Sequence, residues 1–183
     1  HIMAVGFDLY CKLLQDEIMK ASGKEAPLQE VSTQMELGIN AYIPDNFLSD
    51  AVLKVEIYKR MAAAESADEV DCLADEMRDR YGQLPDCVLN LCLLGKIKVL
   101  GKKLAISAII QQPGCFEVKF APEHPITGQA LVTLCQSWSK RIGFSDKKCF
   151  MIRMSTEGLD NSVLKAETLL KMLDQLYGMV RDN

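Results

Sequence analysis

Three charged residues in the stretch 65–80 have the types and spacing needed for ion-pair chemistry. Glu76, Asp79 and Arg80 stand at positions i, i+3 and i+4, so they share one face of a helix. Two carboxylates and a planar guanidinium are suited to pairing with arginine and carboxylate side chains of another protein surface. The alternative is that Glu76 and Arg80 simply pair with each other along the helix. The sequence leaves both interpretations open.

The helix that carries this triplet is predicted over 66–81. Ser66 and Glu69 form a capping box at its start, and Gly82 is suited to ending it. Its buried stripe is expected to consist of Val70, Leu73, Met77 and Tyr81. This stripe places the charged triplet on a face turned largely away from the protein interior.

Thiol and histidine catalysis is a weaker hypothesis. The chain has seven cysteines without a CxxC pair, and its two histidines are His1 and His124. These features favour reduced thiols in a cytoplasmic protein and argue against a Cys/His zinc site. We expect His124, between Glu123 and Pro125, to be an exposed loop residue. The alternative is a catalytic Cys–His dyad that includes His124, which is a third and weaker hypothesis for the function of the chain.

Motifs for nucleotide or metal chemistry are not found. The stretch 95–103 departs from a phosphate-binding loop, because five residues instead of four separate Gly95 from Gly101 and because it falls in a predicted helix. The sequence also has no GxGxxG after a strand, no HExxH and no GxSxG. It therefore predicts a non-catalytic chain with no metal or cofactor of its own.

Two basic stretches, 96–103 and 140–153, carry the second hypothesis, an accessory nucleic-acid-binding domain. The first holds four lysines and no acid: Lys96, Lys98, Lys102 and Lys103. The second holds five bases and one acid: Lys140, Arg141, Lys147, Lys148, Arg153 and Asp146. Such patches are suited to phosphate contacts. Solvated faces are the plainer interpretation, since the whole chain carries a net charge of −4.

The apolar periodicity predicts an α+β fold, with four to six helices packed on a small, mostly antiparallel sheet. Apolar alternation or short apolar runs indicate strands at 35–43, 106–110, 116–120 and 150–154. Helical spacing indicates helices at 7–18, 47–62, 66–81, 85–100, 126–138 and 163–180. Asp45 is expected to cap the second of these helices. No apolar run is long enough to span a membrane, so no membrane partner is expected.

Several short motifs, in order, carry a resemblance to a known family. They are Ala4-Val5-Gly6-Phe7-Asp8-Leu9-Tyr10, Ala41-Tyr42-Ile43-Pro44-Asp45, Ile57-Tyr58-Lys59-Arg60, Asp79-Arg80-Tyr81-Gly82 and Leu84-Pro85. Together they resemble the C-terminal end of bacterial transcription-repair coupling factors (Mfd). The resemblance covers roughly 4–110. The family often has arginine at the position of Lys54, and beyond about residue 115 no diagnostic motif supports the resemblance.

The resemblance implies a parent protein that is an ATP-driven double-stranded DNA translocase of the helicase superfamily. Such a parent uses ATP and Mg²⁺, removes stalled RNA polymerase from DNA and recruits the excision-repair protein UvrA in the cytoplasm. We expect 1–3 to be a cloning scar and 4–30 to be a lead-in helix and linker from the end of the translocase module. The stretch 31–183 would then be the C-terminal regulatory domain.

The resemblance also implies a role for the charged triplet. In the family, the C-terminal domain docks on the N-terminal UvrB-like region of the same protein and masks the UvrA-binding surface, an autoinhibition. The docking positions of the family match Glu76, Asp79 and Arg80 here. RNA polymerase, DNA and UvrA would be reached only through the parent.

Overall fold

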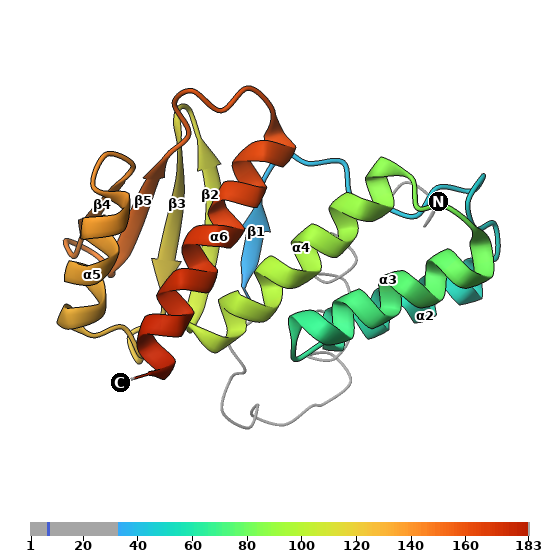
Figure 1. Cartoon of the computed structure of the whole chain (residues 1–183), viewed down its shortest axis with the longest axis horizontal. Coiled ribbons are helices and arrows are strands. Elements are labelled where there is room, and N and C mark those ends of the chain that lie inside the picture. The colour runs from blue at the N-terminus through green and yellow to red at the C-terminus, as the bar shows by residue number, and fades with distance from the viewer. Residues whose placement is uncertain (1–6, 8–32, 183) are drawn as a thin grey trace. The chain divides into compact units, whose positions relative to one another are not determined.

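The computed structural model describes Phe7 and residues 33–182. The predicted scar at 1–3, nearly all of the lead-in helix and the linker lie outside these residues, so the limits 1–3, 4–30 and 31–183 stay predictions. The chain forms two compact units, one of residues 1–29 and 39–99 and the other of residues 30–38 and 100–183. The described residues hold five helices and a five-stranded mixed sheet (Figure 1), which confirms the α+β prediction.

The first unit is built from α2 (Ala51–Ala63), α3 (Ala67–Tyr81) and most of α4 (Asp86–Lys103). The start of α3 follows from its sequence, since Ser66 Oγ accepts a hydrogen bond from the Glu69 amide at 3.2 Å. The Glu69 carboxylate accepts from the Glu65 amide instead of the predicted Ser66 amide. Gly82 ends the helix as predicted, with a φ of 95° that a side chain would disfavour.

The beginning of α2 corrects the prediction for Asp45. Residues 45–47 form a turn, in which the Phe47 amide donates to the Pro44 carbonyl at 3.0 Å. The helix therefore starts later, and Asp50 caps it by accepting from the amides of Val52 and Leu53. The Asp45 carboxylate pairs instead with the buried ammonium group of Lys54.

Helix α4 has buried apolar residues along most of its length, from Val88 to Leu100. In the first unit its Gly95 lies so close to α2 that an added Cβ would stand 2.5 Å from Met61 Sδ. In the second unit, a Cβ on Gly101 would clash with the side chain of Thr33. Both glycines of the stretch 95–103 are therefore packing positions in a helix, where close approach excludes a side chain.

The second unit contains the sheet, in the strand order β1-β2-β3-β5-β4. Its strands are β1 (Gln34–Glu36), β2 (Ile106–Gln112), β3 (Cys115–Phe120), β4 (Ile142–Ser145) and β5 (Met151–Ser155). Strand β1 runs parallel to β2, and the other neighbours are antiparallel. The predicted strands at 106–110 and 116–120 form a hairpin, in which Gln112 pairs with Cys115 across a turn where Gly114 has a φ of 78°.

Two strands differ from the prediction. The alternating stretch 35–43 is a strand only as far as Glu36, because Gly38 takes a φ of 59° and turns the chain out of the sheet. Leu37, Ala41 and Ile43 are buried beyond that point, which is why the sequence pattern continues to Ile43. Strand β4 was not predicted, because it is only four residues long and lies between charged residues.

Helices α5 (Gly128–Trp138) and α6 (Ser162–Arg181) pack against each other on one side of the sheet (Figure 1). Both were predicted, and both begin with a side-chain cap, from Thr127 and Asn161. None of the helices in the described part of the chain is both long and apolar enough to cross a membrane.

Candidate docking surface on helix α3

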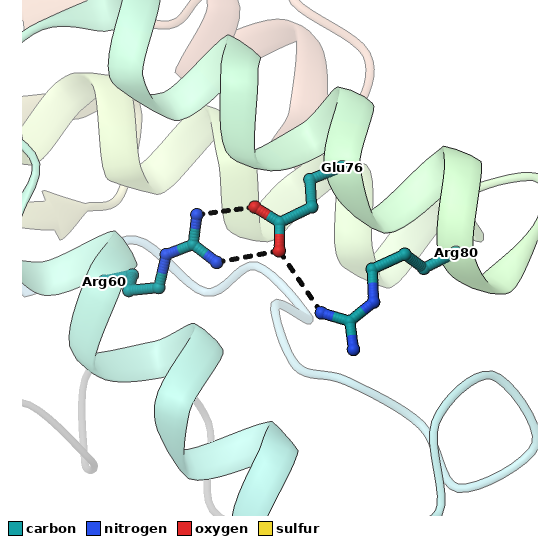
Figure 2. Close-up of polar contacts among 3 residues, drawn as sticks. All are labelled: Arg60, Glu76 and Arg80. Atoms are coloured by element: carbon teal, nitrogen blue, oxygen red, sulfur yellow. Dashed lines mark hydrogen bonds and ion pairs between the residues drawn. The ribbon is translucent and has the colours of Figure 1, made fainter.

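The Glu76 carboxylate of α3 lies between two arginines (Figure 2). Arg60, near the end of α2, donates from Nη1 to Oε1 at 2.9 Å and from Nη2 to Oε2 at 2.6 Å. Arg80, one turn further along α3, reaches Oε1 from Nη1 at 3.3 Å. We call Arg60, Glu76, Asp79 and Arg80 the charged face. The bidentate pair with Arg60 has the stronger geometry of the two.

The structure brings the three predicted residues together on an exposed surface. The side chain of Arg80 is 53% exposed and that of Glu76 is 36% exposed. Asp79 is also exposed, and its carboxylate has no ion pair or hydrogen bond within the described residues. The ion pair between Glu76 and Arg80, which was the alternative interpretation, does form. It uses one nitrogen of the guanidinium and leaves most of the Arg80 donors accessible.

The Arg60 pair stabilises the ionised form of the Glu76 carboxyl. Its hydrogen bonds hold the pKa of the Glu76 carboxyl below the usual range, with a smaller lowering from Arg80. The same hydrogen bonds raise the pKa of Arg60. Glu76 and Arg60 are therefore both ionised at neutral pH.

A small hollow lies beside the charged face, between α2 and α3. Its lining combines the three paired side chains and Glu56 with apolar ones: Leu53, Glu56, Ile57, Arg60, Leu73, Glu76, Met77, Arg80 and Tyr81. Its volume is about 10 Å³, roughly the space for one water molecule.

Arg60 is the residue of this surface that the sequence did not reveal. It lies 16 positions before Glu76 and on another helix. In the sequence, Arg60 was visible only as a basic residue near the end of one predicted helix, and the next predicted helix is rich in acidic residues. The bidentate geometry depends on how α2 packs beside α3, which spacing along one helix cannot show.

The predicted phosphate-contacting lysines fall in both units. In the first unit, Lys96 pairs with Asp71 at 2.7 Å and Lys98 lies 5.7 Å from the centre of the Phe7 ring. In the second unit, Lys103 lies 5.1 Å from the centre of the Tyr177 ring, and Lys102 is exposed. Lys96, Lys98 and Lys103 therefore each have a local partner among the described residues.

The second basic stretch, 140–153, contains both paired arginines and exposed lysines. The Arg141 guanidinium donates to the Glu157 carbonyl at 3.0 Å, and Arg153 pairs with Glu117 at 3.0 Å. The three lysines Lys140, Lys147 and Lys148 are exposed. The two arginines therefore stabilise the local structure, and only the lysines are left for contacts with another molecule.

The thiol and histidine candidates do not form a catalytic pair in the described residues. His124 is half-buried against Phe120 and Phe150 instead of exposed, and its Nδ1 accepts from the Ile126 amide at 3.3 Å. Burial raises the pKa of the Cys92 thiol to about 11, which keeps it protonated. In the described chain, no group of three or more His, Cys, Asp and Glu residues could hold a metal ion.

Comparisons with known proteins agree on one family. The family model described as the TRCF domain matches residues 37–131. A transcription-repair-coupling factor of Bacillus subtilis is 30% identical over 98% of this chain, which spans 15% of that protein. One of Haemophilus influenzae is 40% identical over 74% of the chain and 12% of its own length.

A solved structure gives the same result for the fold. The crystal structure of the C-terminal domain of a transcription-repair coupling factor superposes with a TM-score of 0.74. The match covers 86% of this chain and 99% of that domain at 21% identity. The chain thus has the fold of a C-terminal domain of this kind. It belongs to the transcription-repair-coupling factor family.

Proposed function

We propose that this chain is a non-catalytic regulatory domain of a transcription-repair coupling factor. Its charged face docks on the N-terminal UvrB-like region of the same protein and masks the surface that binds UvrA. The parent is an ATP-hydrolysing DNA translocase that removes stalled RNA polymerase in the cytoplasm, with ATP and Mg²⁺ bound outside this chain. The chain spans 15% of the length of the Bacillus subtilis relative. We therefore assign ATP hydrolysis, DNA translocation and polymerase removal to the full-length parent protein and not to this chain.

The observation that carries the proposal is the unused pairing capacity of the charged face. The Asp79 carboxylate is exposed and has no partner in the described residues, and most of the Arg80 fork is accessible. An acceptor and a planar donor are thus held side by side on a rigid helix. A surface that presents an arginine to Asp79 and a carboxylate to Arg80 is its complement.

The paired Glu76 serves this surface as an anchor. It fixes Arg80 from one side, while Arg60 fixes Glu76 from the other. Restricting the Arg80 side chain before docking lowers the conformational entropy that docking removes. The charged face therefore combines three paired side chains with one free carboxylate.

A mask of this kind works through a two-state equilibrium. A docking free energy of about 3 kcal/mol would leave less than about 1% of the molecules open. The interface should be polar and modest in area, as contacts between domains of one chain commonly are. A ligand that binds only the open state can then displace it.

Charge reversal in the full-length factor tests the proposal. Asp79→Lys disturbs no contact within the described residues, and Glu76→Lys with Asp79→Lys reverses both carboxylates of the face. We expect both variants to bind UvrA more tightly and to hydrolyse ATP faster without DNA, with the double variant showing the larger change. The matched control is Glu167→Lys with Asp174→Lys, which makes the same charge change at exposed positions of α6.

Unchanged UvrA binding and ATP hydrolysis in both variants would exclude the masking role of this face. An equal increase in the α6 control would show that net charge, and not the charged face, sets the equilibrium. Thermal unfolding of each variant shows that the comparison is made between folded proteins.

A further inference from the structure

The backbone of β4 has one hydrogen-bonding side that its own sheet does not use. Ser155 N donates to the Arg141 carbonyl at 2.6 Å, and the register pairs Gly143 with Arg153 and Ser145 with Met151. In an antiparallel ladder every second residue bonds to the neighbour. Arg141, Gly143 and Ser145 therefore face β5, and the N–H and C=O groups of Ile142 and Phe144 point away from it.

That unused side is an open edge, because β4 is the last strand in the sheet order (Figure 1). Neither Ile142 nor Phe144 makes a backbone hydrogen bond outside the ladder within the described residues. Two donors and two acceptors therefore stand at the spacing that a further strand would match.

The core-side surface of the sheet is also partly exposed at this strand. Phe144 stands opposite Ile152 and on the same side of the sheet, and Ile152 in turn stands opposite Val118. Ile152 and Val118 are fully buried, whereas Phe144 is 55% exposed. The apolar layer thus extends to a large side chain that is more than half exposed in the described structure.

The charge around the strand is strongly positive. The stretch 139–148 has four basic residues and one acid, a net charge of +3 in a chain whose total is −4. Lys140 precedes β4, and Lys147 and Lys148 follow it, all three exposed and without an ion pair in the described residues. The open edge is therefore flanked at both ends by unpaired cations.

From these features we propose that β4 is a docking site for an extended acidic peptide segment. The segment adds to the sheet as a sixth strand, pairs with the backbone of Ile142 and Phe144, and places an apolar side chain on Phe144. Its carboxylates meet Lys140 at one end and Lys147 and Lys148 at the other. Backbone pairing gives affinity here, and the alternating side chains give specificity.

A peptide satisfies this surface better than a nucleic acid does. Phosphates can neutralise the lysines, but they offer no N–H donors to the outward carbonyls of Ile142 and Phe144. Lysines at sheet edges can also simply prevent unwanted strand pairing, and the experiment below distinguishes that role from peptide binding.

The test uses the whole 183-residue chain and the fluorescein-labelled peptide Asp-Val-Glu-Val-Glu-Val-Asp. Fluorescence anisotropy of the label measures binding of the peptide to the chain. We expect saturable binding below about 1 mM. N-methylation of two successive central residues removes a donor from each edge of the peptide and should weaken binding at least about tenfold. Replacing its acids with lysine should abolish binding.

Two variants of the chain locate the site. Lys140→Gln with Lys147→Gln and Lys148→Gln should weaken binding about tenfold or more. Lys59→Gln with Lys165→Gln and Lys171→Gln, the charge-matched control, should not. Phe144→Pro removes an outward N–H that β5 does not use, together with the exposed ring, and should also abolish binding. If Phe144→Pro does not fold, Phe144→Ser tests the ring alone.

Three results would overturn the proposal. The first is no binding of the peptide at the highest chain concentration tested, which would mean that the lysines only prevent unwanted strand pairing. The second is equal binding of the N-methylated peptide, which reduces the contact to charge. The third is tighter binding of a seven-nucleotide single-stranded DNA that Phe144→Pro leaves unchanged. None of these variants alters the charged face, so this proposal and the proposed function fail independently.

Discussion

Arg60 and Glu76, 16 residues apart in the chain, form a two-bond ion pair that links the surfaces of α2 and α3. The pair is partly exposed, with 45% of the Arg60 side chain and 36% of the Glu76 side chain accessible. Exposed pairs contribute little individually, but bidentate geometry places this one near the upper end of their range. Its strength and pH dependence can be measured directly.

A double-mutant cycle of Arg60→Gln and Glu76→Gln should give a coupling energy of about 0.5–1 kcal/mol at neutral pH. The pKa of Glu76 is lowered by folding, so this stability is present above its unfolded pKa and is lost as the pH falls through the folded value. Urea unfolding at several pH values measures it. A coupling energy that persists when Glu76 is protonated would show that the pair acts by packing and not by charge.

Gly95 should not tolerate a side chain. In Gly95→Ala the new Cβ would stand 2.5 Å from Sδ of Met61, which is only 1% exposed and has little room to move. We expect a loss of about 1–3 kcal/mol in the free energy of unfolding. The matched control is Gly178→Ala in α6, where the added Cβ would meet no atom within 4 Å apart from its own helix backbone and chain neighbours, so stability should rise slightly. Equal effects at the two glycines would contradict the close packing of α4 on α2.

Lys54 should depend on its partner Asp45. The lysine is 6% exposed, and the Asp45 carboxylate is the ion-pair partner of its ammonium group. Asp45→Asn leaves a buried cation without its counter-charge and should cost about 1–3 kcal/mol of unfolding free energy. Lys54→Met, which removes the cation and keeps the aliphatic length, should cost less. If Lys54→Met proves the more damaging change, the ammonium group itself stabilises the fold.

The thiols should differ sharply in reactivity. The pKa of Cys92 is raised to about 11 by burial, so roughly 0.1% of that thiol is ionised at pH 8. Cys72 and Cys149 are exposed and should react with iodoacetamide first, while Cys92 should react only when the chain unfolds. Peptide mass spectrometry after a timed reaction distinguishes the three. Early modification of Cys92 would mean that this part of α4 opens readily.

Local chemistry in the sequence determined a large part of the secondary structure. The Ser66 cap and Gly82 define α3, and Pro113 with Gly114 defines the hairpin between β2 and β3, because each signal acts within a few residues. The placement of Glu76, Asp79 and Arg80 on an exposed face also followed from one helical period. In each case the residues that interact are neighbours in the chain, so their spacing carries the information.

Contacts between distant segments were decided only by the tertiary structure. The alternating pattern through Ile43 could not show that sheet pairing stops at Glu36, since pairing depends on a partner strand far along the chain. The same holds for Arg60 beside Glu76 and for Gly95 against Met61, where two helices must first pack. Periodicity reports which side of an element is buried, but the identity of the segment that covers it depends on packing among residues far apart in sequence.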